Sequence, residues 1–337
     1  MALNVLWYLL IGILFTVYLI LDGFDLGVGI LSPFLGKTEE EKRKLLKSIG
    51  PFWDGNEVWL LAGGGALFAA FPVVYATVFS GFYVSLTLLL LALMLRILSI
   101  EFRNKLEGSF QKRVLDAGFF ISSLLIVIIL AVALSNIVRG LPLAEGKHYY
   151  GGMRGLLNGY SVFTAVFAVA VLVMQGSIYT VLKQERELSQ RARRVAAVSV
   201  WLVLIFYVGS VVLTFLYAGN RFSNFIQHRA LSMVLPLPLV MGFMAYRYIK
   251  KGYATSAFLC SSLLITSLMA IVGIGNYPFL VPNLKGMGGL TILNAASTPK
   301  TLHTMLIIAL IGVPLVVGYT IYVYRIFRGK VNLEEGY

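Results

Sequence analysis

Long apolar segments, separated by short polar connections, dominate the pattern of this chain. A run of about 20 apolar residues is typical of a helix that crosses the roughly 30 Å hydrocarbon core of a membrane. The pattern predicts nine such helices, approximately over residues 5–31, 53–72, 77–98, 115–138, 159–182, 196–218, 230–249, 254–275 and 302–326. We therefore expect an all-α polytopic membrane protein with nine transmembrane helices.

Basic residues are distributed unevenly between the connections. The connections and helix flanks on one side hold 21 Lys and Arg residues, and those on the other side hold 7. Cytoplasmic connections carry the excess of positive charge, so we expect the N-terminus outside and the C-terminus in the cytoplasm. The chain is 58% hydrophobic and only 13% charged, which excludes a soluble core. Its net charge of +13 then reports topology and not nucleic-acid binding.

A weak internal repeat suggests how the helices are grouped. The first helix ends with Asp22-Gly23, and the fifth passes through Gln175-Gly176 at about the same depth and in the same direction. This favours a single membrane domain over 1–337, built from two four-helix bundles (1–138 and 159–275) and a ninth helix (302–326). A chance match between the two dipeptides is the alternative.

Four acidic residues are not explained by connections, the tail or a helix start further along the chain. Asp22 and Asp25 are three residues apart near the inner end of the first helix, and Asp54 and Glu57 are three apart at the start of the second. All four are expected in the inner third of the membrane, where Arg96 is the basic residue at comparable depth and the expected partner of Asp22 and Asp25. The helix dipole alone could account for Asp54 and Glu57, but it disfavours acids at the end of a helix.

No predicted span contains Asp, Glu, Lys or Arg in its central or outer part. A carrier that moves charge across the membrane normally has ionisable residues at the midplane, so a proton-coupled carrier is disfavoured. The pattern favours a half-channel that takes protons from the cytoplasm and passes them sideways to a neighbouring subunit. A purely structural scaffold is the other alternative, because such a subunit needs no buried acids.

Two further features concern packing and cofactors. The triple glycine Gly63-Gly64-Gly65 predicts close approach of a neighbouring helix, within the bundle or from a partner. The histidines lie in an outer connection or at outer helix ends, at His148, His228 and His303. We therefore expect no haem, no metal site and no catalytic residue in this chain.

Several motifs resemble subunit II of the cytochrome bd-type quinol oxidases. They are DGFDLGVG from Asp22, GPFWDGNEVWLLAGGGALFAAFPVVYA from Gly50, SGFY from Ser80 and NAAS from Asn294. The likeness covers the whole chain. It implies a respiratory terminal oxidase, in the plasma membrane of a prokaryote, that oxidises membrane quinol and reduces oxygen to water with protons from the cytoplasm.

The resemblance also implies roles for partners and residues. Haem b and haem d belong to the larger subunit I, a small single-helix subunit can join the complex, and some members bind a structural quinone in this subunit. Asp54 matches a position linked to proton uptake, and Trp59 one linked to an apolar oxygen path. Glu57 stands where some relatives have a glutamine, so the proton route of this chain can differ from theirs. From the residues themselves, Asp22 and Asp25 join Asp54 and Glu57 in the predicted proton route.

Overall fold

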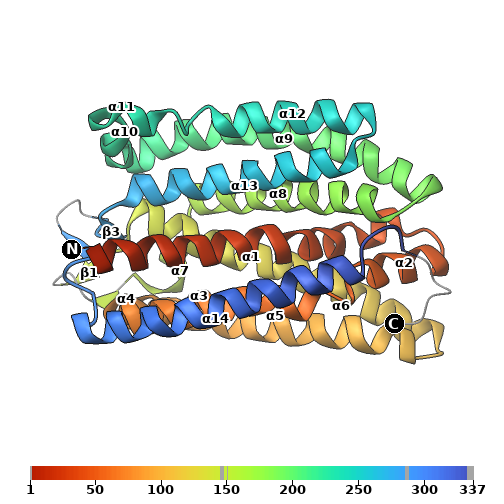
Figure 1. Ribbon diagram of the computed structural model, residues 1–337, viewed down its shortest axis with the longest axis horizontal. Helices are drawn as coiled ribbons and strands as arrows, with labels where there is room; N and C mark the ends of the chain where they lie inside the picture. Colours follow the sequence, from red (N-terminus) through yellow and green to blue (C-terminus); the bar gives the residue numbers. More distant parts are fainter. Residues whose placement is uncertain (1, 145–147, 150, 285–287, 332–337) are drawn as a thin grey trace.

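The computed structural model describes residues 2–144, 148–149, 151–284 and 288–331, and long helices that run along one common axis form most of it (Figure 1). The first residues of α1 (Ala2–Leu35) and the last residues of α14 (Pro299–Ile326) lie at opposite ends of this axis (Figure 1). Between them the chain forms, in order, α2 (Glu39–Ile49), α3 (Trp53–Ala70), α4 (Pro72–Gly81), α5 (Tyr83–Phe102), η1 (Arg103–Lys105), α6 (Ser109–Arg139), β1 (Leu143–Ala144), β2 (His148–Tyr149), α7 (Gly152–Leu156), α8 (Gly159–Lys183), α9 (Arg186–Ala218), η2 (Gly219–Phe222), α10 (Ser223–Gln227), α11 (Arg229–Ser232), α12 (Leu237–Lys251), α13 (Ala254–Asn276), β3 (Phe279–Pro282) and β4 (Gly289–Thr291).

The described residues contain eight helical segments long and apolar enough to cross a membrane, and the bent pair α3–α4 would make a ninth. The expectation of one continuous helix over 53–72 is wrong at its end, because α3 stops at Ala70 and the chain bends by 120° into α4. Pro72 explains the break: proline lacks an amide hydrogen and fits the first turn of a new helix. The helix expected over 77–98 consequently begins only at Tyr83, after α4.

Helix α1 lies at the centre and contacts α3, α6, α8, α13 and α14. Its closest approach is to α8, where Gly27 faces Gly176. A Cβ atom added to Gly27 would lie 2.0 Å from the carbonyl oxygen of Leu172, so only glycine fits there. The division into two four-helix bundles stays a prediction, but the two helices that carry the suggested repeat do cross here.

The end that holds the start of α1 is covered by short strands, which the expectation of an all-α chain missed. Strand β1 pairs with β2 and β3 with β4, both antiparallel, and a bridge between Leu141 and Asn283 joins the two connections. Strands of two to four residues are too short to give an alternating pattern in the sequence.

The opposite end carries α2 and the basic connections, and we expect it to face the cytoplasm (Figure 1). A capping box between Thr38 and Glu41 starts α2. The buried Arg103 bonds to Asp116 of α6 at 2.6 Å and to Glu39 of α2 at 2.8 Å. These ion pairs fix α2 beneath the long helices.

Candidate functional site

A buried ion pair joins α1 and α5 near this expected cytoplasmic end. Arg96 donates from Nη1 to Oδ2 of Asp22 at 2.9 Å and from Nη2 to Oδ1 at 2.5 Å, and both side chains are fully buried. The expectation that Arg96 partners the first acidic pair is confirmed. A bidentate ion pair of this kind fixes the relative orientation of the two side chains as well as their distance.

Asp25 lies one turn further along α1 and is fully buried in the same cluster. Its Oδ2 is 4.0 Å from Nη2 of Arg96 and accepts a hydrogen bond from Nδ2 of Asn56 at 2.8 Å. Its Oδ1 has no hydrogen-bond partner among the described residues, and neither has Nε of Arg96. One guanidinium therefore faces two carboxyl groups, and one of these carboxyls is incompletely bonded.

The two members of the second acidic pair have different surroundings. Asp54 is exposed on α3 and accepts a bond from the amide of Gly55 at 2.7 Å, whereas Glu57 is half-buried and interacts through space with the charges of Asp22 and Arg96. The position of all four carboxyls in the inner third of the membrane stays a prediction, but the exposed Asp54 lies outside the group that the other three form around Arg96. Residues two apart on a helix point about 200° apart, so turning Asn56 inward turns Asp54 outward.

An aromatic layer separates the cluster from α2. Phe24 stacks on Tyr179 of α8 with ring centroids 3.9 Å apart, and Phe52 lies 4.4 Å from Tyr324 of α14. The Tyr324 hydroxyl donates to Oδ1 of Asn56 at 3.0 Å. The sequence analysis missed Asn56 and Tyr324. The amide of Asn56, inside the WDGN motif, was a usable signal, while a tyrosine near the end of an apolar helix is usually a membrane anchor.

Of the other residues predicted on α3, Trp59 and Gly63 pack inside this chain, and Gly64 and Gly65 do not. Trp59 is buried, and its Nε1 has no partner among the described residues. A Cβ atom added to Gly63 would meet the ring of Phe15 at 2.9 Å, but one added to Gly64 or Gly65 would meet nothing within 4 Å. The prediction of close helix contact thus holds inside this chain only at Gly63.

A largely apolar cavity of about 370 Å³ lies deeper in the bundle, between α1, α6, α8 and α13. At one end it is lined by Tyr18, close to Asp22, and at the other by Tyr160, Arg221 and Asn276. Arg221 is buried and donates from Nε to the carbonyl of Val138 at 2.9 Å, and Oδ1 of the buried Asn276 has no partner in the described part of the chain. The cavity has the size and lining of a site for an apolar molecule with a polar head.

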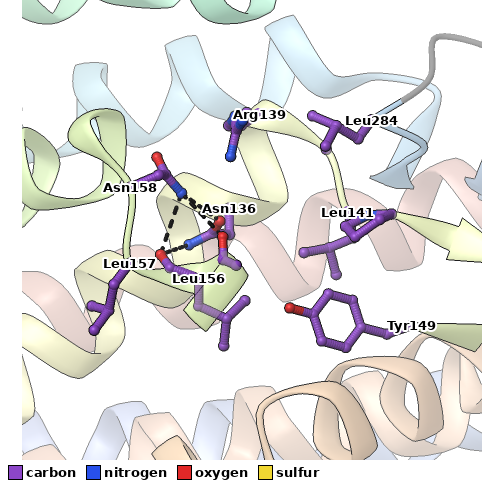
Figure 2. A pocket seen from close by; sticks show the side chains of 11 residues that line it. Asn136, Arg139, Leu141, Tyr149, Leu156, Leu157, Asn158 and Leu284 are labelled. Carbon is purple, nitrogen blue, oxygen red and sulfur yellow. Dashed lines mark hydrogen bonds between the residues drawn. The ribbon is translucent and has the colours of Figure 1, made fainter. Parts of the chain in front are cut away.

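A second cavity, of about 290 Å³, lies near the short strands (Figure 2). Asn136 donates to the carbonyl of Leu156 at 2.8 Å and accepts from Asn158 at 3.1 Å (Figure 2). It also donates to the carbonyl of Val132 at 2.8 Å. These amides bond to each other and to backbone carbonyls, and so they connect the end of α6 to the start of α8. None of the predicted site residues lines this cavity.

None of the three histidines belongs to the buried cluster of Asp22, Arg96 and Asp25. His148 is in β2, His228 lies between α10 and α11, and His303 is in the first turns of α14. Within the described residues, no three His, Cys, Asp or Glu side chains are grouped closely enough to hold a metal ion. The expectation that this chain binds no haem stays a prediction.

Comparison with known proteins connects this arrangement to one family. The profile of the family described as cytochrome bd terminal oxidase subunit II matches residues 3–327. The chain is 32% identical to cytochrome bd-I ubiquinol oxidase subunit 2 of Escherichia coli (strain K12), over 99% of this chain and 96% of that protein. It is 33% identical to cytochrome bd ubiquinol oxidase subunit 2 of Bacillus subtilis (strain 168), over 99% and 98%.

A solved structure supports the same fold. The bd oxidase from Geobacillus thermodenitrificans contains a chain that superposes with a TM-score of 0.82, covering 97% of this chain and 99% of that one, at 14% identity. With the family profile matched over nearly the whole length and two relatives above 30% identity, this multi-span membrane protein belongs to the cytochrome bd terminal oxidase subunit II family.

Proposed function

We propose that this subunit provides a proton-uptake route for the oxidase, from the expected cytoplasmic end towards the haem-bearing subunit I. Reduction of oxygen to water consumes protons, and the relatives named above are subunits of ubiquinol oxidases. The proposed proton route begins at the exposed Asp54, continues to the half-buried Glu57 and ends at the buried cluster of Asp22, Arg96 and Asp25.

The observation that carries this proposal is the charge of the buried cluster. Two carboxyls share one guanidinium, so a negative charge stays uncompensated unless a proton occupies one of them. Asp22 accepts hydrogen bonds from both Nη1 and Nη2 of Arg96. Oδ1 of Asp25, in contrast, has no hydrogen-bond partner among the described residues. Asp25 is therefore the proton-exchanging group, and the Asp22–Arg96 pair is its electrostatic support.

The position of Asp54 gives the route its direction. Asp54 shares the exposed face of α3 with Val58 and Leu61, and the aromatic pair of Phe24 and Tyr179 closes the path towards α2. Protons therefore enter the proposed route at an outward face of the bundle and move inward to the buried cluster. Subunit I, which carries haem b and haem d in this proposal, receives them from that cluster.

The experiment compares three variants of the assembled complex. Asp25→Asn keeps the size of the side chain but removes its exchangeable proton, and turnover per haem is expected to fall about tenfold, within the effect of a proton-transfer group. Asp54→Asn should fall less, because Glu57 lies further along the same route. The double variant should be no slower than Asp25→Asn, because the two changes interrupt one path.

Glu101→Gln is the matched control, since Glu101 lies near the same end and, among the described residues, forms only a surface pair with Lys105 at 3.5 Å. Oxygen uptake, haem content and pH dependence are measured for every variant. Wild-type rates in all of them across the pH range would leave a scaffold role, in which this subunit serves only the assembly of subunit I. A fall in haem content with unchanged turnover per haem would point to that same scaffold role.

Two finer assignments accompany the proton route. We assign Trp59 to the apolar oxygen path, since its indole is buried and an apolar run of α3 follows it in the sequence. The cavity that ends at Arg221 fits a structural quinone, with Arg221 as the donor to a quinone carbonyl and the apolar walls around the tail. Such a quinone would brace the bundle. Arg221→Leu should lower the quinone retained per haem after purification while turnover with added quinol is unchanged; retention at the wild-type level contradicts the assignment.

A further inference from the structure

The amide of Asn56 has a defined orientation among three partners. Nδ2 donates to Oδ2 of Asp25 at 2.8 Å and faces the carbonyl of Leu21 at 3.4 Å, while Oδ1 accepts from the hydroxyl of Tyr324 at 3.0 Å. Rotating the amide by 180° would point Oδ1 at a carboxylate and a backbone carbonyl, both of which only accept. The hydroxyl of Tyr324 supports the observed orientation by donating to the acceptor end.

The ring of Tyr324 is held independently of its hydroxyl. It lies 4.4 Å from Phe52 and meets the edge of Phe24 at 6.5 Å, measured between ring centroids. The rest of α14 is loosely attached: among its described residues only Leu302 is buried. Replacing Tyr324 by phenylalanine therefore removes one hydrogen bond and leaves the aromatic packing in place.

We propose that Tyr324 of α14 is a positioning residue for Asp25, acting through the amide of Asn56. The inference rests on the proposed function, in which Asp25 exchanges protons. By fixing the donor end of Asn56 on Asp25, Tyr324 stabilises the charged form of that carboxyl and sets the pH range in which the proton route works. The ninth helix thus contributes to proton uptake as well as to the outer surface of the bundle.

The charged groups that interact with Asp25 are Asp22 of α1, Glu57 of α3 and Arg96 of α5, and the test leaves all three in place. The hydroxyls of Tyr179 and Tyr324 are neutral in the pH range of turnover, and that of Tyr179 donates to a backbone carbonyl and not to the Asn56–Asp25 chain. Helix α13 carries no charged residue, and Asp116 of α6 is held by Lys42 and Arg103. A change at Tyr324 alone therefore reports on the hydrogen-bonded chain through Asn56.

The decisive variant is Tyr324→Phe in the purified complex, with oxygen uptake per haem measured against pH. Loss of the supporting bond should move the pH profile towards higher pH by about half a unit, part of what a hydrogen bond to a charged group contributes. Tyr179→Phe is the matched control. Its ring also contacts Phe24, but its hydroxyl donates to the carbonyl of Ser48 at 2.6 Å, so any loss of stability should leave the profile unmoved.

Asn56→Val tests the same chain from its other end. It should move the profile at least as far as Tyr324→Phe, and adding Tyr324→Phe to it should produce no further shift. If Tyr324→Phe loses haem, Asn56→Val alone decides, and an unmoved profile in it overturns the inference. Additive shifts would also overturn it, because Tyr324 would then act by another path.

The two levels of the proposal fail in different ways. If Asp25→Asn slows turnover while Tyr324→Phe keeps the wild-type profile, the positioning role is wrong and the proton route stands. If Asp25→Asn runs at the wild-type rate, the proton route itself is wrong, whatever Tyr324 does.

Discussion

Two buried polar clusters lie at similar depth on the two crossing helices, and they differ in charge. On α1, Asp22 and Asp25 share Arg96, and bonding groups of Asp25 and Arg96 are left unused within the described residues. On α8, Gln175 accepts from Ser261 at 2.5 Å and donates to Ser262 at 3.1 Å, and its amide also faces the carbonyl of Ile20. One cluster is charged and incompletely bonded, and the other is neutral and satisfied.

The difference indicates where chemistry is located in this chain. A neutral cluster with its partners in place stabilises the contact between helices and has no proton to exchange. A charged cluster in the membrane is costly to hold, so its retention points to a role beyond packing. If the chain is a repeat of two similar halves, only the first half has kept ionisable groups at this depth.

The sharpest test of the comparison is to remove the cation from the charged cluster. Arg96→Met leaves Asp22 and Asp25 buried without a positive partner and should lower the free energy of unfolding by about 3–5 kcal/mol. Thermal unfolding and the yield of haem-loaded complex measure the effect. Gln175→Met is the counterpart in the neutral cluster. It should lower the free energy of unfolding by only about 1 kcal/mol, because the Ser261 hydroxyl keeps its bond to the carbonyl of Phe258. Equal losses in the two variants would remove the distinction between the clusters.

A smaller loss of stability is expected at the contact between α1 and α8, the helices that carry the two clusters. Gly27→Ala places a Cβ atom 2.0 Å from the carbonyl oxygen of Leu172, so α1 and α8 must separate, at a cost of about 1–3 kcal/mol. Gly12→Ala on the same helix meets nothing within 4 Å and is the control. The melting temperature of the complex should fall for Gly27→Ala and not for Gly12→Ala; a fall in both would mean that helix propensity or the partner surface, and not the crossing, decides.

Much of the architecture follows from sequence because the membrane limits the choices. A span must be apolar and about 20 residues long, so the number and approximate position of the helices could be read directly. Arg96 could be identified as the partner of Asp22 from depth alone, because so few charges are placed inside the spans. The break at Phe71 could not be located as well, because apolar residues continue on both sides of Pro72 and only the direction of the chain changes.

The sequence by itself determined the class of protein, the position of its acids along the predicted helices and the motifs of its family. Only the tertiary structure decided which acid is buried. Asp25, Asp54 and Glu57 all lie in membrane helices near one end, but the rotation of α3 turns Asn56 towards Asp25 and leaves Asp54 exposed. It also decided that Tyr324, 268 residues away from Asn56 in the chain, bonds to it. Spacing along one helix fixes relative angles, whereas the absolute rotation of a helix and its distant neighbours are set by packing, which no local pattern encodes.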